Sequence, residues 1–181
     1  MSVAIRIALA DDQALVRGGL RALLNGFEQL QVAVEASDGD ALLQALEQTS
    51  VDVILSDIRM PGCDGIELVR RLQARQNRTP VILLTTFDEP ELLLRASAAG
   101  ARGYLLKDAS PADLADAIRR VARGESLLAP VATDLVRDRY AFRDQLPPSG
   151  TFNDREVAIL RLIAGGGALP GGELPTLVLS L

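Results

Sequence analysis

Val51-Asp-Val-Ile-Leu-Ser56 is a short run of mostly β-branched and aliphatic residues, and Asp57 follows it directly. A run of this kind predicts a strand with both faces buried, as in a parallel sheet that helices cover on either side. Strands are also predicted at Ile5–Ala10, Gln31–Ala36, Pro80–Leu84 and Gly103–Leu106. Segments of this type therefore recur at regular intervals through the first 124 residues.

Helices are predicted after each strand, because apolar residues recur there at helical spacing. They are residues 13–26, a helix that begins at Ser37 or Asp38, one from Asp64 or Gly65 to Arg75, one that begins at Pro90, and one that Ser110 caps and Gly124 ends. Five strand–helix units predict an α/β fold, doubly wound around a five-stranded parallel sheet. Ligands of such sheets bind beyond the carboxyl ends of the strands.

The composition excludes several classes of site. The 181 residues include no histidine, no tryptophan and a single cysteine, Cys63, which we interpret as a small apolar filler. The lack of histidine excludes catalytic triads and histidine-ligated zinc, and one cysteine cannot form an intrachain disulfide. The sequence shows neither a membrane-spanning stretch nor the pattern of a signal peptide. We therefore expect a cytoplasmic protein that does not associate with membranes.

The charged residues restrict the chemistry further. The net charge is −5, which opposes non-specific binding of the whole chain to nucleic acid. The chain has 19 basic residues, and Lys107 is the only lysine among them. Chemistry that requires a lysine must therefore use Lys107.

Polar side chains follow four of the predicted strands, and the topology brings them to one edge of the sheet. They are Asp11, Asp12, Asp57, Thr85, Thr86 and Lys107. Three carboxylates in one crevice repel each other unless a cation lies among them, and Mg²⁺ is the simplest hard cation with oxygen ligands. Mg²⁺ favours phosphate as a further ligand, and a carboxylate nucleophile can form an acyl phosphate.

Taken one at a time, these residues also allow ordinary structural interpretations. Asp11 and Asp12 could cap a helix, Asp57 could be a solvated loop aspartate, and Lys107 could be a surface charge. Thr85 could satisfy backbone groups at a strand end. The functional interpretation rests on the combination.

Four stretches resemble the receiver domain of two-component response regulators, specifically of the NarL/FixJ type. They are Ala10-Asp-Asp-Gln13, Leu55-Ser-Asp-Ile-Arg-Met-Pro-Gly-Cys-Asp-Gly65, Leu84-Thr-Thr-Phe-Asp88 and Ala99-Gly-Ala-Arg-Gly-Tyr-Leu-Leu-Lys-Asp108. Together, in this order and spacing, they are highly specific. The resemblance implies a flavodoxin-like receiver domain over residues 1–124, followed by a linker over residues 125–150.

The resemblance also implies a role for each site residue. Asp57 is the expected phosphoacceptor. Asp12 is an expected direct ligand of Mg²⁺, Asp11 a ligand directly or through water, and the backbone carbonyl of Arg59 a third ligand. The remaining roles implied are contacts of Thr85 and Lys107 with the phosphoryl group, and an aromatic switch at Tyr104 that follows Thr85.

Residues 151–181 match this family only in part. Phe152–Gly165 is similar to the first helix of a LuxR-type helix-turn-helix domain, but no basic recognition helix follows. Residues 162–181 contain no lysine or arginine, and five arginines stand against seven acidic residues from 125 to 181. A DNA-binding domain needs a net positive charge. We therefore expect a truncated, frameshifted or divergent remnant that does not bind DNA.

The function expected from these features is that of a response regulator, not an enzyme, of a transcription-regulator lineage. Its expected partners are a sensor histidine kinase and a second copy of the chain, bound through the receiver. One alternative is a stand-alone receiver that signals through protein contact. Another is a phosphatase of the haloacid-dehalogenase type, but that family places an aspartate two residues after its nucleophile, and Arg59 stands there.

Overall fold

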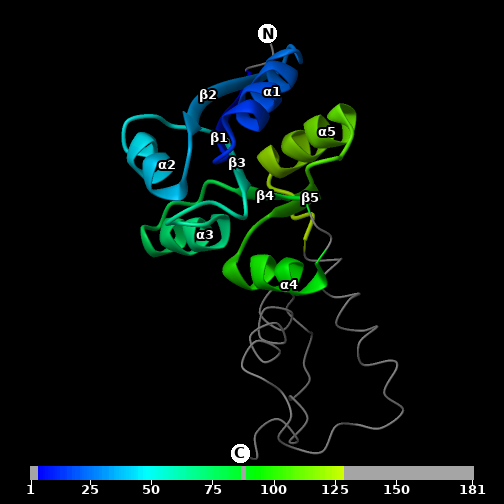
Figure 1. The fold of residues 1–181 in the computed structure, drawn as a ribbon. Coiled ribbons are helices and arrows are strands. Elements are labelled where there is room, and N and C mark those ends of the chain that lie inside the picture. The colour runs from blue at the N-terminus through cyan, green and yellow to red at the C-terminus, as the bar shows by residue number, and fades with distance from the viewer. Residues whose placement is uncertain (1–3, 87–88, 129–181) are drawn as a thin grey trace, which may run out of the picture.

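The computed structural model describes residues 4–86 and 89–128 and contains one five-stranded parallel sheet (Figure 1). The strand order is β2-β1-β3-β4-β5. The strands are β1 (Ile5–Ala10), β2 (Leu30–Ala36), β3 (Val53–Asp57), β4 (Val81–Thr85) and β5 (Gly103–Leu106). The predicted doubly wound α/β fold is confirmed over this part of the chain.

Five helices alternate with the strands: α1 (Ala14–Asn25), α2 (Gly39–Leu46), α3 (Gly65–Ala74), α4 (Pro90–Ala99) and α5 (Pro111–Ala122). Asp38 caps α2, Asp64 caps α3 and Ser110 caps α5, each by accepting a hydrogen bond from a backbone N–H three residues later. Two helix boundaries contain the predicted proline or glycine: Pro90 begins α4, and Gly124, at φ +92°, follows α5.

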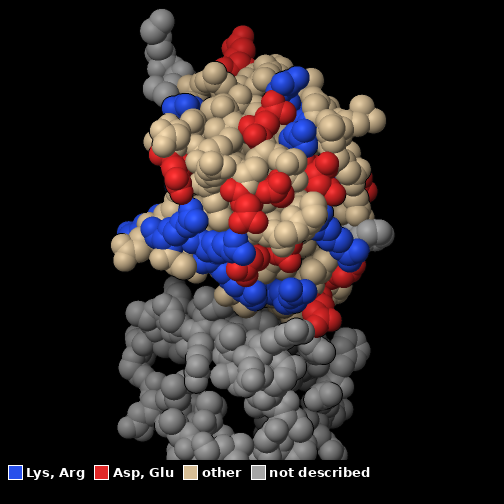
Figure 2. All heavy atoms as spheres, turned by 60° about the vertical axis from the view of Figure 1, so that its left-hand side comes forward, with Lys and Arg blue, Asp and Glu red and all other residues tan. Residues whose placement is uncertain are grey.

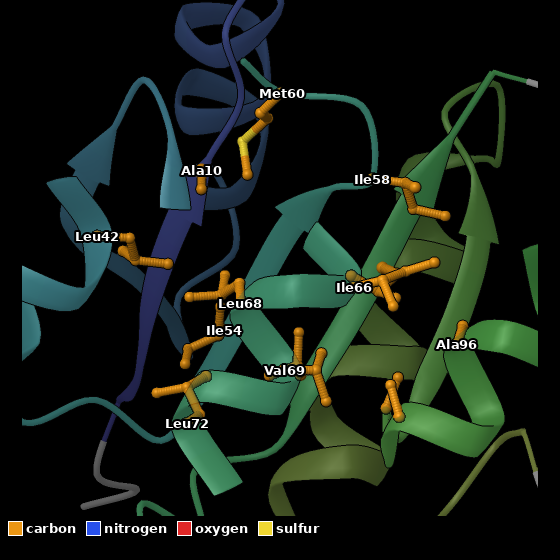
Figure 3. Packing of buried hydrophobic residues seen from close by; sticks show 14 of the residues in the cluster. Ala10, Leu42, Ile54, Ile58, Met60, Ile66, Leu68, Val69, Leu72 and Ala96 are labelled. Carbon is orange, nitrogen blue, oxygen red and sulfur yellow. The ribbon is translucent and has the colours of Figure 1, made fainter. Parts of the chain in front are cut away.

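Alternate side chains of each central strand point to opposite faces of the sheet, and this divides the core in two. Ile7, Leu9 and Leu55 pack with α1 and α5 on one face. On the other face, Ala8, Ala10 and Ile54 pack with α2, α3 and α4, a cluster that Figure 3 shows from close by. Both faces of the central strands are therefore buried, which explains their nearly continuous apolar sequence.

The chain covers the edge strand β5 as it leaves α5. The backbone N–H of Leu127 donates to the carbonyl of Arg102, just before β5, at 2.7 Å. Leu127 packs on the α1/α5 face, while the next residue, Leu128, is buried in the cluster of the opposite face. This segment thus passes around the edge of the sheet. Within residues 4–86 and 89–128, no helix is long and apolar enough to cross a bilayer.

Candidate functional site

The carboxyl ends of β1, β3, β4 and β5 meet at one edge of the sheet. The register pairs Ala10 with Ser56, Asp57 with Leu84, and Thr85 with Leu106. Asp57 and Thr85, which end their strands, are consequently brought to the same edge as Asp11 and Lys107, which follow β1 and β5. A backbone hydrogen bond of 2.7 Å from the Lys107 N–H to the Thr85 carbonyl continues the pairing beyond β5.

Three carboxylates lie together at this edge. Asp11, Asp12 and Asp57 each have a carboxylate oxygen within 4.8 Å of an oxygen of the other two. The side chains of Asp11 and Asp57 are buried, whereas Asp12 is exposed. The structure thus brings together the three acidic residues that the sequence singled out. Asp57 is no solvated loop aspartate, so that ordinary interpretation is wrong.

Lys107 connects two of these carboxylates. Its Nζ lies 2.7 Å from Oδ2 of Asp11 and 2.9 Å from Oδ2 of Asp57, and its side chain is only 11% exposed. The alternative of a surface charge is therefore wrong. The family resemblance implies a contact of Lys107 with a phosphoryl group, but no local pattern predicts this bridge, because it joins residues 96 positions apart.

Backbone N–H groups donate to the carboxylates of Asp11 and Asp57, and Arg17 donates to the backbone carbonyl of Asp11. Oδ1 of Asp11 accepts the N–H of Gln13 at 2.8 Å, and the Asp11 carbonyl accepts a hydrogen bond from Arg17 at 2.6 Å. Oδ1 of Asp57 accepts the N–H of Arg59 at 3.3 Å. Sequence reasoning missed Arg17, since a single arginine one turn into a helix carries no distinguishing signal.

Burial and charge set the protonation of the two central groups. Burial raises the pKa of Asp57 above its ordinary value of 3.8, and Lys107 lowers it without cancelling the effect of burial. Burial also lowers the pKa of Lys107, but its hydrogen bonds to Asp11 and Asp57, together with the attraction of their charges, raise the pKa above its ordinary value of 10.5. Burial thus favours the neutral form of Asp57, whereas the neighbouring carboxylates favour the charged form of Lys107.

The other predicted site residues lie on the neighbouring strands. Thr85 ends β4 and is 2% exposed, while Thr86 is exposed. Tyr104 is half-buried on β5, opposite Leu83, and packs against the cluster that contains α4. Residues 87 and 88, the end of the third matching stretch, lie outside the described residues.

The donor set fits a hard divalent cation. All three acidic side chains offer oxygen, the ligand that Mg²⁺ prefers. Lys107 supplies one positive charge against three negative ones, so a net negative charge remains to attract the cation.

The raised pKa of Asp57 leads to a prediction about stability. Folding favours the neutral form of Asp57 more than the unfolded chain does, so the contribution of Asp57 to stability is fully present below pH 3.8 and is lost as pH rises through the higher folded pKa. We therefore expect Asp57→Asn, with chelator present, to raise the midpoint of thermal unfolding at pH 7. The gain should shrink as the pH falls toward 4. Asp108→Asn, at an exposed position, is the control. Equal midpoints of Asp57→Asn and wild type at pH 7 would contradict the assignment.

Comparison with known proteins agrees with this geometry. Residues 7–119 match the family of the response regulator receiver domain. The transcriptional regulatory protein YxjL of Bacillus subtilis is 40% identical over 166 residues, which cover 90% of this chain and 76% of that protein. The transcriptional regulatory protein DesR of the same organism is 36% identical over 162 residues, with the same coverage of both chains.

Solved structures show the same likeness. The response regulator ChrA of a heme-sensing two-component system is 39% identical, with a TM-score of 0.62 over 91% of this chain and 77% of that one. The receiver domain of RcsB from Salmonella enterica, solved with the phosphomimetic BeF₃⁻, is 27% identical, with a TM-score of 0.64 over 73% of this chain and 98% of that one. Since the receiver match covers more than half of the chain and surrounds the acidic site, this protein belongs to the response regulators with a receiver domain, among the NarL/LuxR-type transcriptional regulators.

Proposed function

We propose that this chain accepts a phosphoryl group on Asp57 from a partner histidine kinase. The observation that carries the proposal is the buried Asp57 carboxylate, held between Lys107 and the pair Asp11 and Asp12. An oxygen of Asp57 attacks the phosphorus of the phosphohistidine and forms an acyl phosphate. The phosphorus–nitrogen bond breaks, and its electron pair returns to the imidazole of the kinase.

The chain's own residues prepare this transfer. The Arg59 N–H fixes one oxygen of Asp57, which orients the carboxylate. Lys107 uses two of its three N–H donors on Asp11 and Asp57, so the third is available for an oxygen of the phosphoryl group. Asp11, Asp12, Asp57 and the backbone carbonyl of Arg59 would hold Mg²⁺. When bound, the ion neutralises negative charge on the carboxylates and the transferring group.

We infer that the phosphorylated state is transmitted through Thr85 and Tyr104. Phosphorylation adds negative charge and acceptor oxygens beside the buried end of β4, where the Thr85 hydroxyl can donate to them. Tyr104 packs against the cluster that contains α4, so a change of its rotamer alters the face made by α4, β5 and α5.

For the output we propose a receiver over residues 1–124, a linker over 125–150 and an incomplete helix-turn-helix remnant over 151–181, in a cytoplasmic protein. Residues 129–181 lie outside the described residues. The relatives named above are transcriptional regulators, but the neutral or acidic composition of residues 125–181 favours signalling through protein contact, including a dimer of receivers. The phosphatase alternative lacks its second aspartate, at Arg59, and the family match runs against it.

Phosphorylation itself gives the first test. Wild type incubated with acetyl phosphate and Mg²⁺ should gain the mass of one phosphoryl group, and Asp57→Asn should gain none. Excess chelator should abolish labelling of the wild type, because the carboxylates then lack their counter-charge. Asp108→Asn, which changes an exposed aspartate, should be labelled normally. Equal labelling of Asp57→Asn and wild type, by intact-protein mass spectrometry, would show that another residue is the acceptor.

The switch gives a second test. Thr85→Ala and Lys107→Ala should remain phosphorylatable at high acetyl phosphate but lose most of the phosphorylation-induced change in amide exchange on α4 and α5. The reason is that both side chains are assigned to the phosphoryl group. Thr86→Ala, at the exposed neighbouring position, is the matched control. A wild-type exchange response in both variants would refute the switch.

The third test concerns DNA. Base readout in the major groove needs an element with polar or basic side chains at its exposed end, and residues 162–181 contain no lysine or arginine. We expect selection from a random DNA pool, at low salt to favour weak binding, to recover no reproducible half-site with or without phosphorylation. A reproducible motif would establish the chain as a DNA-binding regulator.

A further inference from the structure

The loop between β3 and α3, residues 58–64, carries Arg59 and is in contact with the start of α2. We propose that Gly39, the first residue of α2, is a positioning residue for the phosphorylation site. Because Gly39 has no side chain, Cys63 can pack directly against its backbone. This contact fixes the loop in which the Arg59 N–H donates to Asp57 and the Arg59 carbonyl is expected to bind the metal. The inference rests on the proposed function for its metal and phosphoryl group.

The contact between Gly39 and Cys63 is tight and buried. The Gly39 N–H donates to the Cys63 carbonyl at 3.1 Å, and neither residue is exposed. A Cβ on Gly39 would lie 2.6 Å from both the carbonyl oxygen and the Sγ of Cys63, whereas ordinary contacts begin at 3.4 Å. Gly39 is not among the residues with positive φ. Space, and not backbone conformation, therefore requires glycine here.

The same loop is anchored at its other end beside Asp57. The Gly65 N–H donates to the Ile58 carbonyl at 2.9 Å, and a Cβ on Gly65 would collide with the Asp57 carbonyl oxygen. Ile58 and Met60 are buried between these anchors. Arg59 is exposed, but its N–H reaches Asp57. The position of the Arg59 peptide group thus depends on the two anchors, one on the sheet and one on α2.

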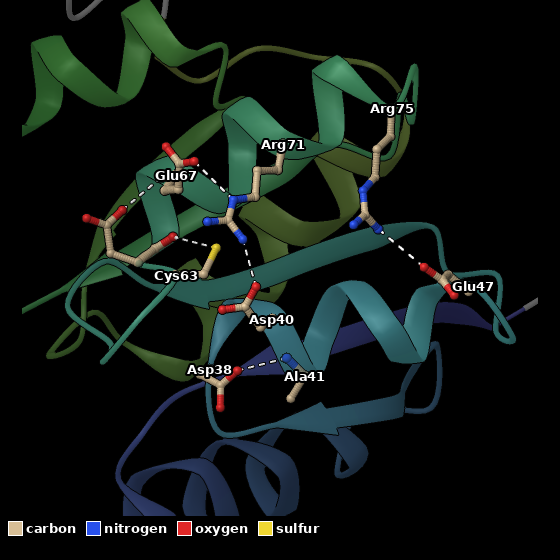
Figure 4. Close-up of polar contacts among 9 residues, drawn as sticks. Asp38, Asp40, Ala41, Glu47, Cys63, Glu67, Arg71 and Arg75 are labelled. Carbon is tan, nitrogen blue, oxygen red and sulfur yellow. Dashed lines mark hydrogen bonds and ion pairs between the residues drawn. The ribbon is translucent and has the colours of Figure 1, made fainter.

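Ion pairs between the exposed sides of α2 and α3 lie beside the Gly39–Cys63 contact (Figure 4). Arg71 of α3 binds Asp40 of α2 at 2.7 Å and Glu67 of its own helix at 3.0 Å. Figure 2 shows basic and acidic side chains in contact over this face of the molecule. Exposed ion pairs of this kind contribute about 0–1 kcal/mol each. They align the two helices, while the buried Gly39–Cys63 contact sets how closely the loop approaches α2.

A methyl group at position 39 must push the loop and α2 apart. Restoring ordinary contact requires the Cys63 atoms to retreat from 2.6 to at least 3.4 Å, a change of 0.8 Å. Some residues do not bind the metal themselves but orient the residues that do. Mutating such a residue typically lowers metal affinity by about 10- to 100-fold. We therefore expect Gly39→Ala to weaken Mg²⁺ binding by roughly tenfold or more, with saturating Mg²⁺ restoring most of the phosphorylation rate.

The experiment measures the dissociation constant of Mg²⁺ by calorimetry, the thermal midpoint, and the rate of labelling by acetyl phosphate across Mg²⁺ concentrations. The matched control is Gly18→Ala, because a Cβ on Gly18 of α1 meets nothing within 4 Å. A purely structural effect would lower the midpoint and leave the Mg²⁺ dependence of labelling unchanged. A folded Gly39→Ala chain with wild-type Mg²⁺ affinity would overturn the proposal.

A second pair of variants tests the contact from the loop side. Cys63→Val adds bulk against Gly39 and should weaken Mg²⁺ binding in the same direction, whereas Cys63→Ala makes room and should leave the affinity near wild type. If Gly39→Ala does not fold, unchanged affinity in Cys63→Val overturns the proposal. Wild-type chain that binds Mg²⁺ and is labelled on Asp57 retains the proposed function whatever these variants do. If the wild-type chain neither binds Mg²⁺ nor is labelled on Asp57, both the proposed function and the proposed role of Gly39 are wrong.

Discussion

One buried ammonium group, the Nζ of Lys107, holds the carboxylates of Asp11 and Asp57 at the edge of the sheet. Buried carboxylates without a partner carry a large desolvation cost, so these two can lie together only if a cation reaches both. The backbone pairing of Lys107 with Thr85 brings the lysine there. The parallel sheet is thus also the scaffold that sets the distances within the site.

The rest of the site follows from how that scaffold is packed. A one-residue shift in register would move every side chain of a central strand into the core on the opposite face, where the packing does not fit it, so the strand ends are fixed relative to one another. The loop after Asp57 has no such constraint of its own. It gains one from two glycines: Gly65 packs its backbone against the strand end, and Gly39 packs against Cys63. Rigid strands and a tightly anchored loop together present the acidic groups.

Much of this could be predicted from sequence because the signals are local. β1 and β5 have the predicted bounds, Ser110 caps α5 as predicted, and Asp38 is the one of the two candidate residues that caps α2. α3 begins at Gly65, one of its two predicted first residues. β3 begins at Val53, two residues late, since Asp52 is exposed and accepts the Arg6 N–H. The Lys107 bridge and the Gly39–Cys63 contact join distant segments, and no local pattern encodes such an approach.

The segment after α5 that contains Leu127 and Leu128 and passes around β5 affects the protein's tendency to aggregate. A strand at the end of a sheet presents unpaired N–H and C=O groups, which can recruit a strand from another molecule. β5 has only four residues, and the segment after α5 takes up the carbonyl just before its start while two leucines cover both faces beside it. The short strand and the bonded Arg102 carbonyl reduce the backbone edge that β5 offers to another molecule, and so lower the tendency to seed intermolecular β-structure.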